Sequence, residues 1–317
     1  MARVLVTGGA GFIGSNLTEA LLKQGHSVRV LDNFSTGKRE NLVFEEGSSL
    51  LEVIEGDITD FRACQSAVKG IEYVLHQAAV PSVPQSVEDP LNSNRINVGG
   101  TLNILQAARI AGVRRLVYAS SCAIYGDDPT LPKREEMAPR PLSPYALQKH
   151  VGEGYCRLFW QLYGLETVSL RYFNVFGPRQ SPESDYAAVI PRFIVALLQG
   201  RPPVVFGDGE QSRDFVFVGD VVQANLLALS RGQVQGEVVN VASGQAVSLN
   251  CLLEGLRDVL NSEIVPIYRE PRSGDIRHSL GDAQKAKRLL NFVPAVEIKA
   301  GLEKTIAYFR RKEATGK

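Results

Sequence analysis

The sequence predicts an α/β protein with a doubly wound parallel sheet and a smaller C-terminal α/β portion. Three observations lead to this prediction. Short β-branched segments alternate with longer helical patterns through the first half of the chain, a glycine-rich turn joins the first strand to a helix, and the segments after residue 174 become shorter and more mixed. Repeated strand–helix–strand units favour parallel strands joined by right-handed crossovers.

The first half of the chain supplies the predicted sheet. Its strands are expected at Arg3–Thr7, Val28–Leu31, Leu51–Glu55, Tyr73–His76, Arg115–Ala119 and Thr167–Arg171. The helices between them are expected at Ser15–Gly25, Phe61–Lys69, Asn92–Ala111 and Tyr145–Tyr163. The first of these helices ends at a glycine, the residue type that most often follows a helix C-terminus.

The second half is predicted to form a smaller domain. We expect the sheet domain in residues 1–174 and the second domain in residues 175–317, with a helix at Ile190–Gln199. Asp214–Val241 again shows a strand, a helix and a strand. Part of residues 214–245 is therefore expected to pack back on the first sheet.

Composition and charge exclude several classes of function. The chain has 317 residues, of which 44% are hydrophobic and 22% charged, which is typical of a globular protein with a sizeable core. A net charge of +1 provides no overall field that would attract nucleic acid or an acidic membrane surface. We therefore expect neither as a partner.

The cellular location expected from the sequence is the cytoplasm. No apolar run approaches the roughly 18 residues that span a bilayer, and the first residues lead into a strand without the pattern of a signal peptide. The cysteines, Cys64, Cys122, Cys156 and Cys251, are scattered and contain no C-x-x-C pair. Neither a disulfide framework nor a metal site is expected from them.

A glycine-rich segment joins the first predicted strand to the first helix. Gly9, Gly11 and Gly14 match G-x-G-x-x-G, and Gly8, Gly11 and Gly14 have the spacing G-x-x-G-x-x-G. Glycines let the backbone approach a pyrophosphate, and the following helix N-terminus offers free N–H groups and a partial positive charge. Because a strand precedes the motif and a helix follows it, the segment predicts a Rossmann-like dinucleotide site.

Asp32 lies at the end of the second predicted strand, followed by Asn33. A carboxylate there accepts hydrogen bonds from the adenosine ribose and repels a 2′-phosphate, which favours NAD over NADP. The alternative is a turn or helix-capping aspartate. Arg39 is a nearby cation, so we predict a preference for NAD and not exclusivity. Asp57 and Ile58, after the third strand, are candidate adenine contacts or a plain loop.

Tyr145 and Lys149 open a predicted helix with the spacing i, i+4. That spacing places both side chains on one helical face, where they can meet the same ligand. A free phenol has a pKa of about 10, so action as a base near pH 7 needs roughly 4 kcal/mol of phenolate stabilisation, at about 1.36 kcal/mol per pH unit. Lys149 and a positive nicotinamide ring in a water-poor cleft are the natural sources.

Ser121 follows the predicted strand Arg115–Ala119. Such a position faces the crevice where doubly wound folds bind ligands, so Ser121 could bond a substrate hydroxyl beside Tyr145. Taken alone, Tyr145 and Lys149 could be an ordinary surface pair on a helix. Combined with the serine and the glycine turn, they favour a redox site.

These residues resemble the extended short-chain dehydrogenase/reductase family, and within it the UDP-hexose 4-epimerases, closest to the UDP-N-acetylglucosamine subgroup. The resemblance covers nearly the whole chain. Besides the segments already described, it is carried by His76-Gln77-Ala78-Ala79, Asn97-Val98-Gly99-Gly100-Thr101, Arg171-Tyr172-Phe173-Asn174-Val175-Phe176-Gly177, Ser212-Arg213-Asp214-Phe215 and Arg272-Ser273-Gly274-Asp275.

The resemblance implies a role for each matched residue. Tyr145 would be the base, Ser121 its partner at the sugar, and Lys149 a ligand of the nicotinamide ribose. The other NAD contacts implied are Gly8, Gly11, Phe12, Ile13, Gly14, Asp32, Asn33, Asp57, Ile58, Gln77, Ala78, Ala79 and Asn97. The contacts implied for the uridine diphosphate are Asn174, Arg213, Arg272 and Asp275, since guanidinium groups match phosphate oxygens. Alternatively, Arg213 forms a surface ion pair with Asp214 and does not bind the diphosphate.

The reaction implied by the resemblance is redox-neutral. Tyr145 would remove the O4 proton of a UDP-sugar while the C4 hydride passes to NAD⁺, and the 4-keto sugar would turn about its diphosphate and take the hydride back on its other face. NAD would then be tightly held and not consumed. The C-terminal domain would bind the nucleotide-sugar. In the family, the outer faces of the helices Asn92–Ala111 and Tyr145–Tyr163 pack into a homodimer interface, so a homodimer is expected.

Two positions bear on the substrate. Related dehydratases and decarboxylases have an acidic residue where this chain has Cys122, so nothing evident diverts the keto sugar from epimerisation. Ser279 stands where glucose-only epimerases resemble one another in having a tyrosine, which leaves room for an N-acetyl group without excluding glucose. Alternatively Ser279 is a loop serine. Ser82 is a further candidate sugar contact, and His278 is expected to be structural.

Three alternatives to this hypothesis remain at this stage. The first is a UDP-glucuronate 4-epimerase, and the second is a nucleotide-sugar dehydratase or decarboxylase. The third is a non-catalytic, NAD-binding regulatory protein, which the intact Ser121, Tyr145 and Lys149 disfavour.

Overall fold

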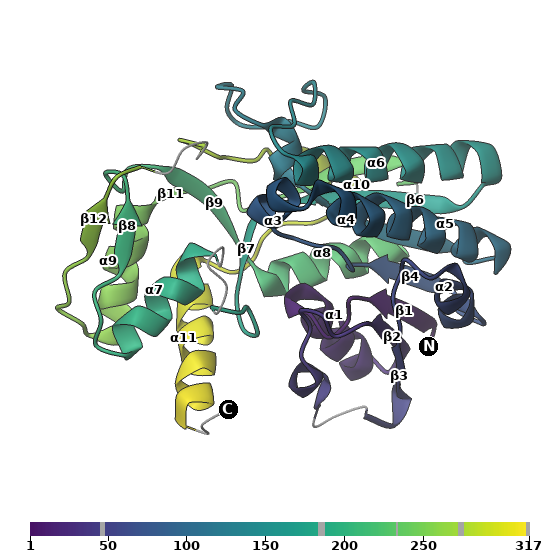
Figure 1. The fold of residues 1–317 in the computed structure, drawn as a ribbon, viewed down its shortest axis with the longest axis horizontal. Coiled ribbons are helices and arrows are strands. Elements are labelled where there is room, and N and C mark those ends of the chain that lie inside the picture. The colour runs from purple at the N-terminus through teal and green to yellow at the C-terminus, as the bar shows by residue number, and fades with distance from the viewer. Residues whose placement is uncertain (45–47, 183–187, 233, 272–275, 315–317) are drawn as a thin grey trace.

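The computed structural model describes residues 1–44, 48–182, 188–232, 234–271 and 276–314. A large parallel sheet dominates it (Figure 1). The sheet has seven strands in the order β10-β6-β5-β4-β1-β2-β3. The strands are β1 (Arg3–Thr7), β2 (Ser27–Asp32), β3 (Leu51–Glu55), β4 (Tyr73–His76), β5 (Arg115–Ser121), β6 (Glu166–Tyr172) and β10 (Glu237–Val241). The predicted fold class, an α/β doubly wound parallel sheet, is confirmed.

The strand order reverses at β1, which pairs with β2 on one side and β4 on the other. Ligands of doubly wound folds bind outside the carboxyl ends of the strands at such a reversal. Thr7, the last residue of β1, stands opposite Leu31 and His76, so Gly8, Asp32 and Gln77 meet at this edge.

Two layers of helices cover the sheet because its strands are apolar on both faces. Val4 and Val6 point to one layer and Leu5 to the other, as alternation along a strand requires. The first layer holds α1 (Phe12–Lys23) and α8 (Val218–Ser230). The second holds α2 (Phe61–Val68), α5 (Thr101–Ile110) and α6 (Pro144–Tyr163).

Two predicted helices differ from the observed ones. Helix α1 begins at Phe12, three residues before the predicted start, because Gly14 lies within its first turn against Gly8. The segment predicted as one helix over Asn92–Ala111 is divided into α4 (Pro90–Asn94), a π-helical stretch, η3 (Arg95–Gly100), and α5. Gly100 in the π-helical stretch packs so closely on Ile58 that a Cβ would lie 2.5 Å from it.

The C-terminal part has a core of its own beside the large sheet (Figure 1). Its elements are β7 (Asn174–Phe176), α7 (Val189–Leu198), β8 (Val204–Phe206), β9 (Ser212–Phe217), β11 (Ala246–Ser248), α9 (Leu249–Leu260), β12 (Ile267–Arg269), α10 (Gln284–Leu290) and α11 (Ile298–Ala314). Strands β7, β9 and β11 form one small sheet, and β8 and β12 form another. Helix α10 contacts α8 and β10.

The two parts of the chain are interwoven. The predicted boundary at residues 174 and 175 falls within β7, which pairs with β9. Beyond β9, helix α8 returns to the large sheet, and β10 adds to its edge beside β6. The predicted strand–helix–strand segment Asp214–Val241 therefore contributes to both sheets.

Candidate active site

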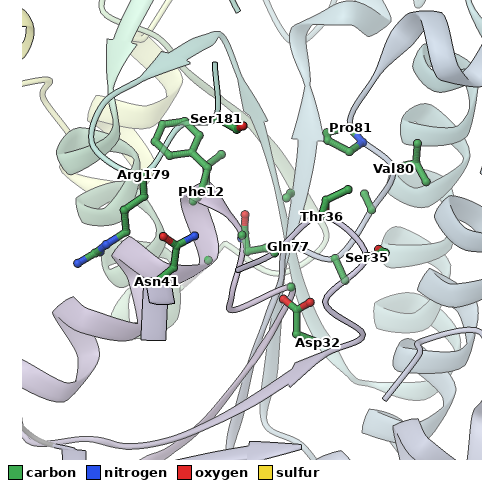
Figure 2. A pocket seen from close by; sticks show the side chains of 18 of the residues that line it. Phe12, Asp32, Ser35, Thr36, Asn41, Gln77, Val80, Pro81, Arg179 and Ser181 are labelled. Atoms are coloured by element: carbon green, nitrogen blue, oxygen red, sulfur yellow. The ribbon is translucent and has the colours of Figure 1, made fainter. Parts of the chain in front are cut away.

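A cavity of about 490 Å³ lies at the carboxyl ends of the central strands. Figure 2 shows Val80 and Pro81 on one side of it and Phe12 and Arg179 on the other, with Gln77 between them. The residues predicted for the cofactor that line this cavity are Gly8, Gly11, Phe12, Ile13, Gly14, Asp32, Asn33, Asp57, Ile58, Gln77, Ala78, Ala79 and Lys149. Tyr145 lines the same cavity. The structure thus brings together segments that lie far apart in the sequence.

The glycine turn is shaped so that only glycines fit at two of its positions. Gly8 has a φ of 67°, and a Cβ there would lie 2.8 Å from the backbone of Ala78. A Cβ on Gly14 would lie 2.1 Å from the carbonyl oxygen of Gly8. Helix α1 then begins with no acidic residue in its first turn and no capping side chain. Its N–H groups face the cavity, an arrangement that suits a pyrophosphate.

Asp32 acts as a turn aspartate and also lines the cavity. Its carboxylate accepts hydrogen bonds from the N–H groups of Ala10 and Phe34, both at 2.8 Å. These bonds hold the glycine turn against the end of β2. Asn33 donates to the carboxylate of Asp57 at 2.9 Å, which fixes the neighbouring wall. Arg39, considered as an aid to NADP binding, forms an ion pair with Glu55 and stacks on Phe34.

Asn97 lies behind the cavity wall. Its side chain is buried, accepts a hydrogen bond from the N–H of Val80 at 2.8 Å and donates to the carbonyl of Val80 at 3.1 Å. It also donates to Gln148 at 2.8 Å. Asn97 therefore holds Val80, which lines the cavity, and links it to the helix that carries Lys149.

Tyr145 and Lys149 are fixed by the first turns of α6. Ser143 caps the helix by accepting from the N–H of Ala146 at 3.2 Å, and the N–H of Tyr145 donates to the hydroxyl of Ser86 at 3.0 Å. Lys149 is buried and donates from Nζ to the carbonyl of Ala119 at 2.7 Å. Its Nζ lies 5.8 Å from the centre of the Tyr145 ring.

Burial pushes both of these side chains toward their neutral forms. It raises the pKa of Tyr145 to about 12, against the opposing effect of a hydrogen bond with Ser121. It lowers the pKa of Lys149 to about 8, against the opposing effects of Cys156 and Glu153. We predicted from the sequence that Lys149 helps to lower the pKa of the phenol. In the structure burial has the largest effect on Tyr145 and raises its pKa.

A second cavity of about 380 Å³ lies between β7, α7 and β9. Asn174 and Arg213, predicted for the diphosphate, line it together with Arg192, and Phe193, Phe206 and Phe215 supply aromatic walls. Ala188 lines both cavities, so the two adjoin.

Asp214, the neighbour of Arg213, does not have the surface position that the alternative of an ion pair assumed. Asp214 is fully buried. Its carboxylate accepts hydrogen bonds from Ser243 and from the N–H groups of Gly244 and Gly281. Asp214 thereby ties β9 to two loops, one of which follows Ser279.

The remaining predicted substrate residues are placed as follows. Ser121 accepts from the N–H of Ala123 at 3.1 Å. Ser82 caps helix α3 (Val83–Glu88) by accepting from Gln85 at 3.2 Å. Ser279 donates from its N–H to the carbonyl of Ser212 at 3.0 Å, and His278 bonds the Ser212 hydroxyl, a structural contact. Arg272 and Asp275 lie outside the described residues.

Cys122 follows Ser121 and is partly exposed. Burial of its thiol raises the pKa of Cys122 to about 12, so the group stays a neutral thiol at physiological pH. It offers no acid or base to a reaction at Tyr145.

Sequence reasoning missed two parts of the wall. Ser35, Thr36, Gly37, Lys38 and Asn41 line the cavity after β2, and Arg179, Tyr308, Phe309 and Lys312 close it from the C-terminal part. The first group looks like an ordinary loop in the sequence, although Gly37 packs on Ala10. The second lies far along the chain and carries no local motif.

The described residues also bear on metal binding and on membrane insertion. Within them, no group of three or more histidine, cysteine, aspartate or glutamate residues is arranged to hold a metal ion. Among the helices that the structure describes, none is both long and apolar enough to cross a membrane.

Known proteins resemble the chain over nearly its whole length. The model of the NAD dependent epimerase/dehydratase family matches residues 4–242. A putative UDP-glucose 4-epimerase of Methanocaldococcus jannaschii is 40% identical over 314 residues, covering 98% of this chain and 100% of the relative. A UDP-N-acetyl-α-D-glucosaminuronate decarboxylase of Bacillus cytotoxicus is 36% identical and covers 98% of each. The solved UDP-N-acetylglucosamine 4-epimerase of Methanobrevibacter ruminantium, in complex with UDP-N-acetylmuramic acid, superposes with a TM-score of 0.94 at 41% identity over 98% of this chain and 99% of that one.

Proposed function

The chain belongs to the NAD dependent epimerase/dehydratase family, and we propose that it is a 4-epimerase of UDP-N-acetylglucosamine and UDP-N-acetylgalactosamine. UDP-glucose and UDP-galactose are proposed as further substrates. One observation carries the proposal: Tyr145 lines the cavity, the Ser121 hydroxyl lowers the pKa of its phenol against the larger effect of burial, and the residue after Ser121 is a neutral thiol.

The residues of the first cavity fit NAD. Gly8 and Gly14 leave space that a Cβ would fill, and the N-terminus of α1 suits the pyrophosphate. Asp32 would bond the adenosine ribose, and Lys149 the nicotinamide ribose. When bound, NAD would supply a hydride acceptor for C4 of the sugar and a positive charge that stabilises the phenolate of Tyr145.

The side chains then divide the proton chemistry between them. As a phenolate, Tyr145 would take the proton from the sugar O4 and later return it, with Lys149 beside its ring in the same cavity. Ser121, whose hydroxyl lowers the pKa of the phenol, would hold the same O4 hydroxyl. Lys149, fixed by the carbonyl of Ala119, contributes a charge that opposes protonation of the phenolate.

The second cavity suits the nucleoside diphosphate. Arg213 and Arg192 offer guanidinium groups to phosphate oxygens, and the aromatic walls suit a uracil ring. Because this cavity adjoins the first at Ala188, a UDP-sugar anchored there would extend its hexose toward Tyr145. The small side chain of Ser279 supports an acetylated sugar, by resemblance.

Decarboxylation and dehydration are the main alternatives, because a decarboxylase is among the relatives. Both reactions need further proton transfer after C4 is oxidised. Cys122 disfavours them, since burial raises the pKa of its thiol to about 12. A UDP-glucuronate 4-epimerase would need a partner for the C6 carboxylate and remains the second candidate for the substrate.

The test is an assay of the purified protein with UDP-N-acetylglucosamine, UDP-N-acetylgalactosamine, UDP-glucose, UDP-galactose and UDP-glucuronate, with products resolved by NMR. We expect the two acetylated sugars to interconvert without added cofactor. Tyr145→Phe should lower kcat at least about 100-fold, the range of a lost general base. Tyr163→Phe, at the far end of the same helix, is the matched control and should retain activity.

Two results would count against the proposal. One is stoichiometric consumption of NAD⁺, which a redox-neutral epimerisation does not allow. The other is loss of carbon dioxide from UDP-glucuronate or of water from a dTDP-hexose, which would assign the chain to the lyases.

A further inference from the structure

A buried carboxylate lies one helical turn beyond Lys149. Glu153 is 4% exposed, and Arg171 donates to it from Nε and Nη2, both at 2.8 Å. The hydroxyl of Ser120 donates to the same carboxylate at 2.5 Å. Arg171 is equally buried. The carboxylate is therefore saturated by a bidentate guanidinium and a short hydrogen bond, an arrangement that fixes its position.

The partners of Glu153 belong to the strands that build the active site. Ser120 lines the cofactor cavity and directly precedes Ser121. Arg171 stands opposite Ser120 in the pairing of β5 with β6, and it directly precedes Tyr172, another lining residue. Glu153 thus joins α6 to the carboxyl ends of β5 and β6.

The same helix face carries Lys149, because four residues separate it from Glu153. Lys149 donates to Ala119, the residue before Ser120. Two contacts one turn apart, Lys149 with Ala119 and Glu153 with Ser120, therefore set how α6 lies along the end of β5. Tyr145, one turn further up the helix, is aligned with Ser121 by that placement.

We propose that Glu153 is a positioning residue of the reaction, which sets the alignment of Tyr145 with Ser121 and provides the countercharge of Lys149. It touches neither cavity, so it acts only through Ser120, Arg171 and Lys149. This inference rests on the proposed redox chemistry at Tyr145 but not on which sugar is used.

The charges around Lys149 explain why Glu153 matters for it. Glu153 opposes the effect of burial on the pKa of Lys149. The charged or titratable groups that face Glu153 or Lys149 are Arg171 on β6, Tyr118 on β5, His76 on β4, and Tyr145, His150 and Cys156 on α6. Without the carboxylate, Arg171 would remain as an uncompensated cation near a second cation. Lys149 would then lose its proton at a lower pH.

Two substitutions distinguish the effect of Glu153 on the position of α6 from the effect of its negative charge. Glu153→Gln keeps the size and a bond to Ser120 but removes the charge. Glu153→Asp keeps the charge and the pair with Arg171 but shortens the reach. The measurement is the single-turnover rate at which bound NAD is reduced by a UDP-sugar, followed by the absorbance of reduced nicotinamide from pH 6 to 10 in the holoenzyme.

The expected results differ between the two variants. In Glu153→Gln the alkaline limb of the pH profile should move to lower pH by about one unit, as expected for the loss of one buried charge. In Glu153→Asp the alkaline limb of the pH profile should stay at its wild-type position, while the rate of NAD reduction falls at every pH. Retention of NAD and the KM for the sugar should change little in both, because neither ligand is touched.

A merely structural pair predicts another pattern. If both variants lower the rate equally at all pH values, or if Glu153→Gln matches the wild type, the proposal is overturned. Should Glu153→Gln not fold, the Glu153→Gln/Arg171→Met double variant removes both charges. For this double variant we expect slower reduction of NAD than in the wild type, with the alkaline limb of the pH profile near its wild-type position. An unchanged rate would contradict the proposal. Because C4 oxidation also begins dehydration and decarboxylation, the readout works even if the wild type proves not to be an epimerase.

Discussion

Tyr145 and Lys149 show what burial does to single titratable groups in this site. Burial raises the pKa of the phenol to about 12 and lowers the pKa of the ammonium to about 8, so both shifts favour the neutral form. The spacing of the pair could be predicted from the sequence, but the net direction of the shift could not, because burial depends on segments far from α6. In the proposed mechanism, a cation bound in the cavity would stabilise the phenolate of Tyr145.

His76 is a buried group of a different kind. It ends β4, and its ring nitrogens lie 2.7 Å from the hydroxyl of Thr7 and 3.0 Å from that of Thr101. Burial, assisted by the charge of Lys149, lowers the pKa of His76 to about 3. The imidazole is thus neutral in the folded protein at every pH where the enzyme would work.

The lowered pKa of His76 makes the free energy of unfolding depend on pH. In an unfolded chain a histidine has a pKa of about 6.5, so between pH 6.5 and 3 the unfolded state binds more protons than the folded state. Folding stability from this group is complete above pH 6.5 and falls as the pH falls, by roughly 2 kcal/mol at pH 5. His76→Gln should remove that part of the pH dependence. Urea unfolding at pH 7 and pH 5 measures it, and an identical loss in variant and wild type would disprove the assignment.

At the scale of elements, the glycine turn between β1 and α1 leaves little room for a side chain at some of its glycines. A Cβ on Gly14 would meet the carbonyl oxygen of Gly8 at 2.1 Å, whereas a Cβ on Gly11 would meet the same oxygen at 3.2 Å. The first contact is with backbone and cannot be relieved by a rotamer change. The second needs only a small adjustment.

We therefore expect the two alanine variants to differ sharply. Gly14→Ala should lower the free energy of unfolding by about 3 kcal/mol or more, the upper range for overpacking, and should lose NAD on purification. Gly11→Ala should cost less than about 1 kcal/mol. Urea unfolding and the NAD content of each purified protein provide the comparison. Equal stability of the two variants would show that the turn can shift.

The elements that could be predicted from the sequence are those with a clear local pattern of apolar residues. β1, β3 and β4 were predicted with the observed bounds, because short runs rich in apolar and β-branched residues indicate strands; β1 and β4 are largely buried, whereas β3 is a partly exposed edge strand. The division of the helix over Asn92–Ala111 could not be predicted, since it accompanies contacts of Gly100 with Ile58 and of Asn97 with Val80. Likewise, nothing in the sequence of α11 indicates that Tyr308 and Phe309 line the first cavity.

At the scale of the whole molecule, the two cavities depend on how the parts interweave. Strand β7 follows β6 but belongs to the small sheet, where it lines the second cavity, while α8 and β10 return to the large sheet. Ala188 lies where the cavities adjoin. The site therefore cannot be assigned to one half of the chain, and the boundary predicted at residues 174 and 175 falls within β7.

The outer face of α6 carries exposed apolar side chains. Leu147, Leu158 and Leu162 are 51%, 46% and 66% exposed, and their spacing of eleven and four residues keeps them on one side of the helix. Leu91 on α4 and Ile110 on α5, two elements that contact or adjoin α6, are also exposed. Exposed apolar side chains that share one face of a helix are typical of an interface.

We propose that this face, the α6 stripe of Leu147, Leu158 and Leu162, pairs two copies of the chain in a homodimer. Leu158→Glu places a charge in the middle of the stripe, and burying an unpaired charge in an interface costs several kcal/mol, so dimerisation should weaken at least about 100-fold. Val43→Glu is the matched control, because Val43 is 79% exposed but lies on the loop after η1 (Arg39–Leu42), away from α6. Sedimentation velocity should show a dimer for the wild type and the control and a monomer for Leu158→Glu. A monomeric wild type, or a variant that stays dimeric, would place the interface elsewhere, and the apolar face of α6 would then need another partner.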